Sequence, residues 1–157
     1  MSKEGRLVDV VVEIHVARPR AEVAAYASDP DRAMCWYKNI KSVEWKTERP
    51  AAVGSRIAFI VARFLGRRLA YTYEVTVAEP GERFVMSTVD GPFPMETTYR
   101  WRDSGVGTTM TLRNRGRASG FSRLLAPFLG TAMRRANRQD LARLKSLLEA
   151  SGPRATP

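Results

Sequence analysis

The chain has 157 residues, of which 44% are hydrophobic and 9% aromatic, so it can bury the core of one domain and is not a disordered chain. Its formal net charge of +10 brings nucleic acid and anionic membranes into consideration as partners. One cysteine and one histidine exclude an internal disulfide and a four-ligand zinc site. No apolar run approaches the roughly 20 residues of a membrane-spanning helix, and the N-terminus has no secretory pattern. We therefore expect a cytoplasmic protein with no metal or cofactor.

The basic residues are spread along the chain rather than gathered in one tail. Residues 1–48 balance acids against bases, whereas residues 49–68 contain five arginines and no acid. No RNA-binding, helix-turn-helix or zinc-finger motif organises these charges. We expect an arginine-rich solvated surface without a specific nucleic-acid site. Weak association with an anionic membrane stays open, as does the oligomeric state.

The first elements are a strand and two short helices. Residues 7–16 alternate, with valines on one face and His15 on the other, which predicts a half-buried strand with its histidine toward solvent. A short amphipathic helix is expected over 21–27. Asp29-Pro30 then ends that helix and starts another, with Ser28 or Asp29 as N-cap and Pro30 at the first position.

The pattern in the middle of the chain predicts consecutive strands joined by short turns, which favours antiparallel pairing. The expected strands are 40–47, 55–64, 68–77, 83–89, 94–102 and 108–117. From residue 121 to residue 150 apolar residues recur every three or four positions, which predicts one long amphipathic helix. Its expected apolar face includes Leu124, Phe128, Leu144 and Leu148. We expect one domain over 1–150 and a frayed tail over 151–157.

Four stretches carry a resemblance to a known family. They are VVVEIHVARPRAEVAAYASDPDRAMCWY, AAVGSRIAF, YTYEVTVAEPGERFVMSTVDGPF and TYRWRDSGVGTTMTL, in that order. The combined order resembles the START-type helix-grip superfamily (SRPBCC), within it the polyketide cyclase/dehydrase-like group of small bacterial proteins. The resemblance implies an α+β helix-grip fold, with two short helices after the first strand. A curved antiparallel sheet of about six or seven strands would wrap around the long C-terminal helix, leaving a cavity for an apolar or amphipathic molecule.

Strand parity supplies candidates for the lining of such a cavity. On 69–77 the more apolar face carries Leu69, Tyr71, Tyr73, Val75 and Val77. Strand 55–64 is ambiguous, and one of its two registers would place Arg63 at the pocket rim. The expected ligand-binding residues are Met34, Trp36, Phe59, Tyr71, Tyr73, Phe84, Met86, Thr97, Tyr99, Trp101, Met110, Asn114, Phe128 and Met133. Met34 and Trp36 would close one end, with Cys35 as a small buried filler.

Three functions remain open at this point. The leading hypothesis is binding or transport of a hydrophobic small molecule, such as a lipid or polyketide-like compound, because the inward set is aromatic with neutral polar members. The alternative is a polyketide cyclase or dehydratase that uses Tyr71, Tyr99, Asn114 or Arg63 for acid–base and oxyanion chemistry. No paired carboxylates or nucleophile motif supports catalysis, so no catalytic residue is assigned. An interaction module that uses the arginine-rich faces is the third.

Overall fold

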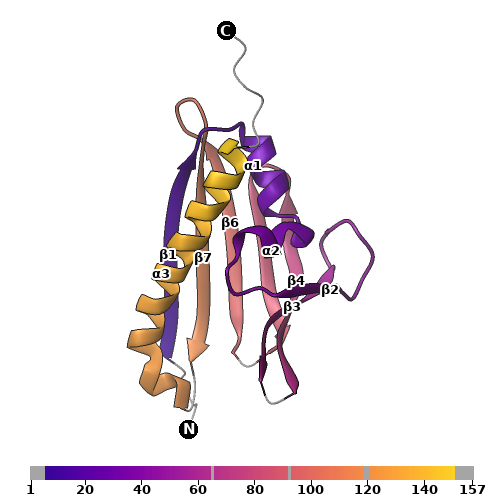
Figure 1. The fold of residues 1–157 in the computed structure, drawn as a ribbon, viewed down its shortest axis with the longest axis vertical. Helices are drawn as coiled ribbons and strands as arrows, with labels where there is room; N and C mark the ends of the chain where they lie inside the picture. Colours follow the sequence, from indigo (N-terminus) through magenta and orange to yellow (C-terminus); the bar gives the residue numbers. More distant parts are fainter. Residues whose placement is uncertain (1–5, 65, 92, 119–120, 151–157) are drawn as a thin grey trace.

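The computed structural model describes residues 6–64, 66–91, 93–118 and 121–150 (Figure 1). In chain order the elements are strand β1 (Arg6–Val16), helix α1 (Arg20–Ala27), the 3-10 turn η1 (Pro30–Arg32), helix α2 (Ala33–Trp36), strands β2 (Ser42–Trp45), β3 (Arg56–Phe64), β4 (Arg67–Glu79), β5 (Arg83–Asp90), β6 (Met95–Asp103) and β7 (Thr108–Ala118), and helix α3 (Phe121–Ala150).

All seven strands form one antiparallel sheet, in the order β1-β7-β6-β5-β4-β3-β2. Strands β2 to β7 follow one another as hairpins, and β1 pairs with the last strand. The expected strands are present to within a few residues, except that 40–47 is shortened to the four residues of β2. The α+β helix-grip fold, with a curved sheet, two short helices after the first strand and a long C-terminal helix, is confirmed.

Alternation places one face of each strand against the helices. In β1, Val8, Val10, Val12 and Val16 are buried, whereas His15 is exposed as expected. In β6 the buried residues are Thr97, Tyr99 and Trp101, and in β7 they include Met110, Leu112 and Asn114. These inward sets agree with the sequence parity, since every second side chain of a regular strand points to the same face.

Strand β4 departs from this parity because it contains a bulge. Its register with β5 shifts between Val75 and Val77, so Thr76 is an extra residue. Both Thr76 and Val77 therefore lie on the outer face, where they line a shallow groove, and Ala78 packs against the core. The expectation that Val77 points inward was wrong, because a bulge reverses the alternation beyond it.

Helix α3 runs along β1 and also contacts α2 (Figure 1). In its C-terminal half, Leu141, Leu144 and Leu148 are fully buried. In its N-terminal half, Leu124 and Phe128 are 75% and 74% exposed, so the described residues do not cover these two members of the expected apolar face, whereas Leu129 and Met133 pack against the core. No helix of the described chain is both long enough and apolar enough to span a bilayer.

The short helices cover part of the inner face of the sheet. Asp29 caps η1 by accepting a hydrogen bond from the Asp31 backbone N–H at 3.0 Å, and Pro30 follows at the first position, as expected. Helix α2 is a single turn, in which Ala33 and Trp36 point inward at a spacing of three residues. Cys35 is exposed, so the expectation that it fills the core was wrong: Trp36 takes the inward position beside it.

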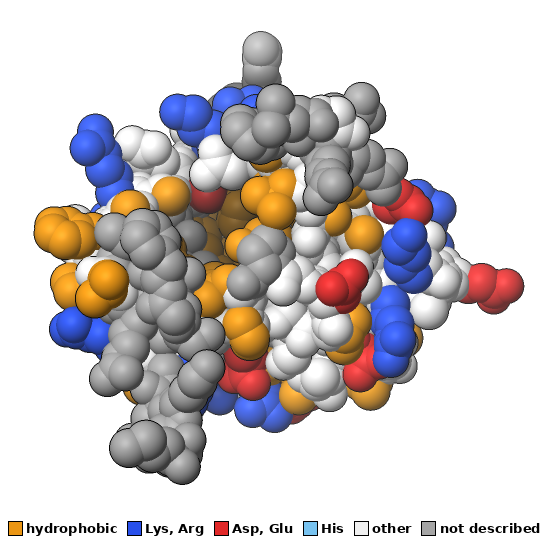
Figure 2. Space-filling view, turned by 90° about the horizontal axis from the view of Figure 1, so that it is seen from below, with side chains coloured by type: hydrophobic (Ala, Val, Ile, Leu, Met, Phe, Trp, Pro, Cys, Tyr) orange, Lys and Arg blue, Asp and Glu red, His pale blue; other side chains and the backbone are white. Residues whose placement is uncertain are grey.

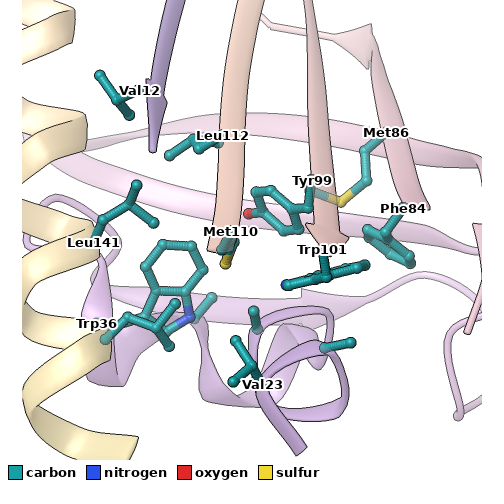
Figure 3. Close-up of a cluster of buried hydrophobic side chains, with 14 of the residues drawn as sticks. Val12, Val23, Trp36, Phe84, Met86, Tyr99, Trp101, Met110, Leu112 and Leu141 are labelled. Atoms are coloured by element: carbon teal, nitrogen blue, oxygen red, sulfur yellow. The ribbon is translucent and has the colours of Figure 1, made fainter. Parts of the chain in front are cut away.

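The core lies between the sheet, α1, α2 and the second half of α3 (Figure 3). Trp36 stacks on Tyr37, with ring centroids 3.9 Å apart, and lies 5.9 Å from Tyr99. Figure 3 shows Tyr99, Trp101 and Phe84 projecting from neighbouring strands as one aromatic layer. Phe84 and Trp101 of this layer line a space under α1, and Phe84 and Tyr99 line another space beside α3.

The two halves of α3 predict different sensitivities to truncation. Leu144→Ala removes a fully buried side chain and should lower the free energy of unfolding by about 2–5 kcal/mol. Leu124→Ala, in the exposed half of the same helix, should change it by less than about 0.5 kcal/mol. Urea unfolding followed by circular dichroism measures both. Equal losses in the two variants would contradict this packing of α3.

Candidate functional site

A cavity of about 250 Å³, here the main cavity, opens between the α1–α2 segment, α3 and the inner face of the sheet. Seen from below, the molecule is hollowed near its centre, and hydrophobic side chains line the hollow (Figure 2). The residues that line the main cavity are Ala27, Ser28, Asp29, Pro30, Ala33, Tyr37, Asn39, Ile40, Phe59, Val61, Tyr71, Tyr73, Phe84, Met86, Met95, Thr97, Tyr99, Asn114, Met133, Ala136, Asn137 and Asp140.

The fourteen candidate residues divide into two groups. Phe59, Tyr71, Tyr73, Phe84, Met86, Thr97, Tyr99, Asn114 and Met133 line the main cavity. The other five do not: Met34 and Phe128 are exposed, Trp36 and Met110 are fully buried in the core, and Trp101 lines a second cavity. The structure therefore brings the first group together around one space, and contact of any of them with a ligand stays a prediction. The side chain of Arg63 lies outside the described residues.

Two hydrogen-bonded pairs of neutral side chains lie in the wall. The hydroxyl groups of Tyr37 and Tyr99 are 2.5 Å apart. Thr97 donates from Oγ1 to Oδ1 of Asn114 at 2.7 Å, which links β6 to β7 inside the sheet. Pairing of this kind lets polar groups occupy a largely apolar wall without the full cost of desolvation.

Helix α3 adds a carboxylate and an amide to the same wall. Asp140 is buried, and its Oδ1 accepts a hydrogen bond from the Lys38 backbone N–H at 3.1 Å. Burial raises the pKa of Asp140, while that hydrogen bond and the charge of Lys38 oppose the rise. Asn137, one turn earlier, is also buried, and its Nδ2 has no hydrogen-bond partner among the described residues. The side chain that lines the main cavity at this position therefore carries an amide donor that the described residues leave unpaired.

The tyrosines of the main cavity stay protonated at neutral pH. Burial raises the pKa of Tyr73 to about 12. Burial, and then the neighbouring Tyr99, raises the pKa of Tyr37 well above its usual value, and burial raises the pKa of Tyr99. Their hydroxyl groups are therefore hydrogen-bond donors and acceptors rather than bases. Among the described residues no group of three or more His, Cys, Asp or Glu could hold a metal ion.

Sequence reasoning missed Tyr37, Asn137 and Asp140. The signal was present on α3, because positions 137, 140, 141, 144 and 148 follow one another at the spacings that keep residues on one helix face. The two polar members were overlooked because an amphipathic helix ordinarily turns such residues toward solvent.

Comparison with known proteins identifies the family. The model for polyketide cyclase/dehydrase and lipid transport matches residues 8–149. The chain belongs to this family. Membership of the helix-grip superfamily and its polyketide cyclase/dehydrase-like group is thereby confirmed. The family description covers catalysis and transport of hydrophobic molecules and does not choose between them. No curated protein sequence matches the chain.

Solved structures show the same fold at low sequence identity. The protein TTHA0849 from Thermus thermophilus is 20% identical, with a TM-score of 0.76, over 92% of this chain and 99% of that one. Protein SA2116 from Staphylococcus aureus, of unknown function, is 14% identical, with a TM-score of 0.74, over 94% and 97%. The di-domain ARO/CYC StfQ of the steffimycin biosynthetic pathway is 12% identical, with a TM-score of 0.73, over 89% and 50%. At these identities the likeness establishes the fold alone.

The raised pKa of Asp140 predicts a pH-dependent effect of Asp140→Asn. Because the folded protein holds the proton more tightly than the unfolded chain, wild-type stability falls as pH rises from the unfolded value of 3.8 through the folded pKa. The variant lacks this loss and should be more stable than wild type at pH 7, with the difference shrinking below pH 3.8. Urea unfolding from pH 3 to pH 7 measures it.

Asp9→Asn is the matched control of opposite sign. Its hydrogen bond with Arg113 lowers the pKa of Asp9, so this variant should be less stable than wild type at pH 7, and acidification should narrow the difference. Destabilisation by Asp140→Asn at pH 7 would contradict the placement of Asp140 in a desolvated wall.

Proposed function

We propose that the protein binds a hydrophobic small molecule, lipid-like or polyketide-like, that carries one or two polar groups in the main cavity. The observation that carries this proposal is the buried Asn137 amide without a partner among the described residues, in a wall that is otherwise mostly apolar. A buried donor left unpaired costs roughly 1–3 kcal/mol, and a ligand carbonyl or hydroxyl that accepts its hydrogen bond would recover part of that cost.

The size and chemistry of the main cavity also support binding of a hydrophobic small molecule. Small-molecule sites usually measure roughly 300–1,000 Å³ and combine apolar walls with a few placed polar groups. The main cavity, at about 250 Å³, lies just below that range. Its polar groups include the Tyr37–Tyr99 pair, Asn137 and Asp140. Because Asp140 is an acceptor when ionised, a neutral ligand with a hydroxyl group fits this wall better than a carboxylate does.

Filling the main cavity should weaken binding. Ala136 and Ala132 lie one turn apart on α3, but only Ala136 lines the cavity and Ala132 is exposed. Ala136→Phe should weaken binding of the neutral fluorophore N-phenyl-1-naphthylamine by at least about tenfold, equal to about 1.4 kcal/mol. Ala132→Phe should bind as wild type does. Fluorescence titration measures both, and native mass spectrometry of the purified protein reports any co-purified ligand.

Two outcomes would count against the proposal. One is the absence of any probe binding or co-purified small molecule in the wild-type protein. The other is equal binding by Ala136→Phe and Ala132→Phe, which would place the probe elsewhere on the protein.

A second candidate function is acid–base catalysis on a polyketide-type substrate in the same cavity. It is favoured by one arrangement: the Tyr37–Tyr99 hydroxyl pair and Asp140, whose pKa is raised by burial, line a single space. A carboxylate with a raised pKa is a stronger base than an ordinary one, and a protonated tyrosine can stabilise a developing enolate oxygen. The candidate groups named from the sequence that line this space are Tyr71, Tyr99 and Asn114.

The test is turnover of a stabilised poly-β-ketone mimic, followed by liquid chromatography and mass spectrometry. If the protein is a cyclase or dehydratase, Tyr99→Phe and Asp140→Asn should each lower kcat by about 100-fold or more while probe affinity stays within about twofold. Tyr26→Phe, outside the cavity, is the control. Absence of turnover by the wild type, or wild-type rates in both variants, would leave binding as the function.

A further inference from the structure

A second cavity, of about 340 Å³ and here named the α1 cavity, lies beneath α1 and beside the β4–β5 turn. Its helical side is lined by three alanines together with Arg20 and Ser28, and its sheet side includes Ala78 and Trp101 and the charged residues Glu79 and Arg83. Alanines reach only a short way from the helix, so a space remains between α1 and the sheet. The Nε1 of Trp101, one of the lining residues, is buried without a hydrogen-bond partner among the described residues.

The two cavities share part of their walls. Ser28 and Phe84 are the residues that line both of them. On the sheet, Phe84 pairs with Ala78 of β4 on one side and with Tyr99 of β6 on the other. Ala78 lines the α1 cavity and Tyr99 lines the main cavity. The Phe84 side chain therefore stands at the boundary between the two spaces.

The ring of Phe84 is the larger of the two side chains shared by the cavities. It stacks on Tyr99 with centroids 6.1 Å apart and planes inclined by 18°, and it is 5% exposed. Figure 3 shows it next to Tyr99, Trp101 and Met86 at the end of the aromatic layer. Ser28, the other shared residue, has a small side chain whose Oγ donates to the Ala24 carbonyl oxygen. Removing the aromatic ring would therefore join the cavities. Truncation of Ser28 would open little space, because its side chain is small.

We propose that Phe84 sets the maximum ligand length, by closing the main cavity against the α1 cavity. This inference rests on the proposed binding function and deepens it. A chain anchored at the Asn137 end can extend only until it meets the Phe84 ring. Where that ring is absent, the chain continues under α1, where a hydrocarbon tail meets the alanines of the lining and its end reaches the charged rim at Arg20, Glu79 and Arg83.

A series of 1-alkanols of increasing length tests this by displacement of N-phenyl-1-naphthylamine. In the wild type, affinity should rise about fourfold per methylene, equal to about 0.8 kcal/mol, up to a breakpoint and then level off. In Phe84→Ala the rise should continue for several further methylenes. Phe84→Leu, which keeps an apolar core residue, should move the breakpoint in the same direction by less, and it serves if the alanine variant folds poorly.

Two further variants distinguish joined cavities from mere added volume. Phe59 lines the main cavity alone, so Phe59→Ala removes the same ring without opening the α1 cavity, and its breakpoint should move less than that of Phe84→Ala. Ala78→Leu narrows the α1 cavity alone, so in the wild-type background it should leave the breakpoint unchanged. In the double variant Phe84→Ala/Ala78→Leu, the breakpoint should return toward the wild-type chain length.

The failures are distinguishable. If the wild type binds neither probe nor alkanol, the proposed function fails and this inference fails with it. If the wild type binds alkanols but Phe84→Ala, Phe84→Leu and Phe59→Ala share one breakpoint, or Ala78→Leu does not reverse the effect of Phe84→Ala, binding stands and the role of Phe84 is overturned.

Discussion

Uneven curvature of the sheet is the constraint on which the cavity depends. The β1–β7, β6–β7 and β5–β6 pairs keep an uninterrupted register, whereas the β3–β4 and β4–β5 pairs contain the shifts near Ile60, Thr72 and Val75. Bulges bend and twist a strand beyond its regular geometry. Helix α3 packs along the regular half, beside β1, and both α3 and the bulged strands β3 and β4 contribute residues to the lining of the main cavity. The space between them is covered by α1 and α2, and the main cavity lies there.

The polar wall of this cavity is a local departure from the rules that stabilise the rest of the fold. Elsewhere the inner face is filled by valine, leucine and aromatic side chains. Around the cavity a carboxylate with a raised pKa and an unpaired amide are kept away from water, and both lower stability relative to an apolar wall. Functional sites often lower the folding stability of a protein in this way. Here both destabilising side chains lie on one face of α3.

How far the sequence predicts this molecule depends on how regular each element is. The alternation of β1, β6 and β7 and the period of the second half of α3 follow from residue type, and the structure agrees with them. The parity beyond Thr76 could not be read from residue type, because a bulge shifts every later side chain without a distinctive residue of its own. Tyr37 and Asp140 come together through the Lys38 hydrogen bond, a contact between segments far apart in the chain that no local pattern contains.

The bulge at Thr76 also limits how this protein can diverge. A substitution in β4 alters one wall position, but loss of the bulge at constant strand length would restore plain alternation and turn Ala78 outward and Glu79 toward the sheet interior. A carboxylate would then stand where an apolar wall is needed. Deletion of Thr76 itself would leave Ala78 facing inward, because the residue lost is the extra one. Relatives that keep both cavities should therefore either keep the bulge or lack one residue at this point of the strand.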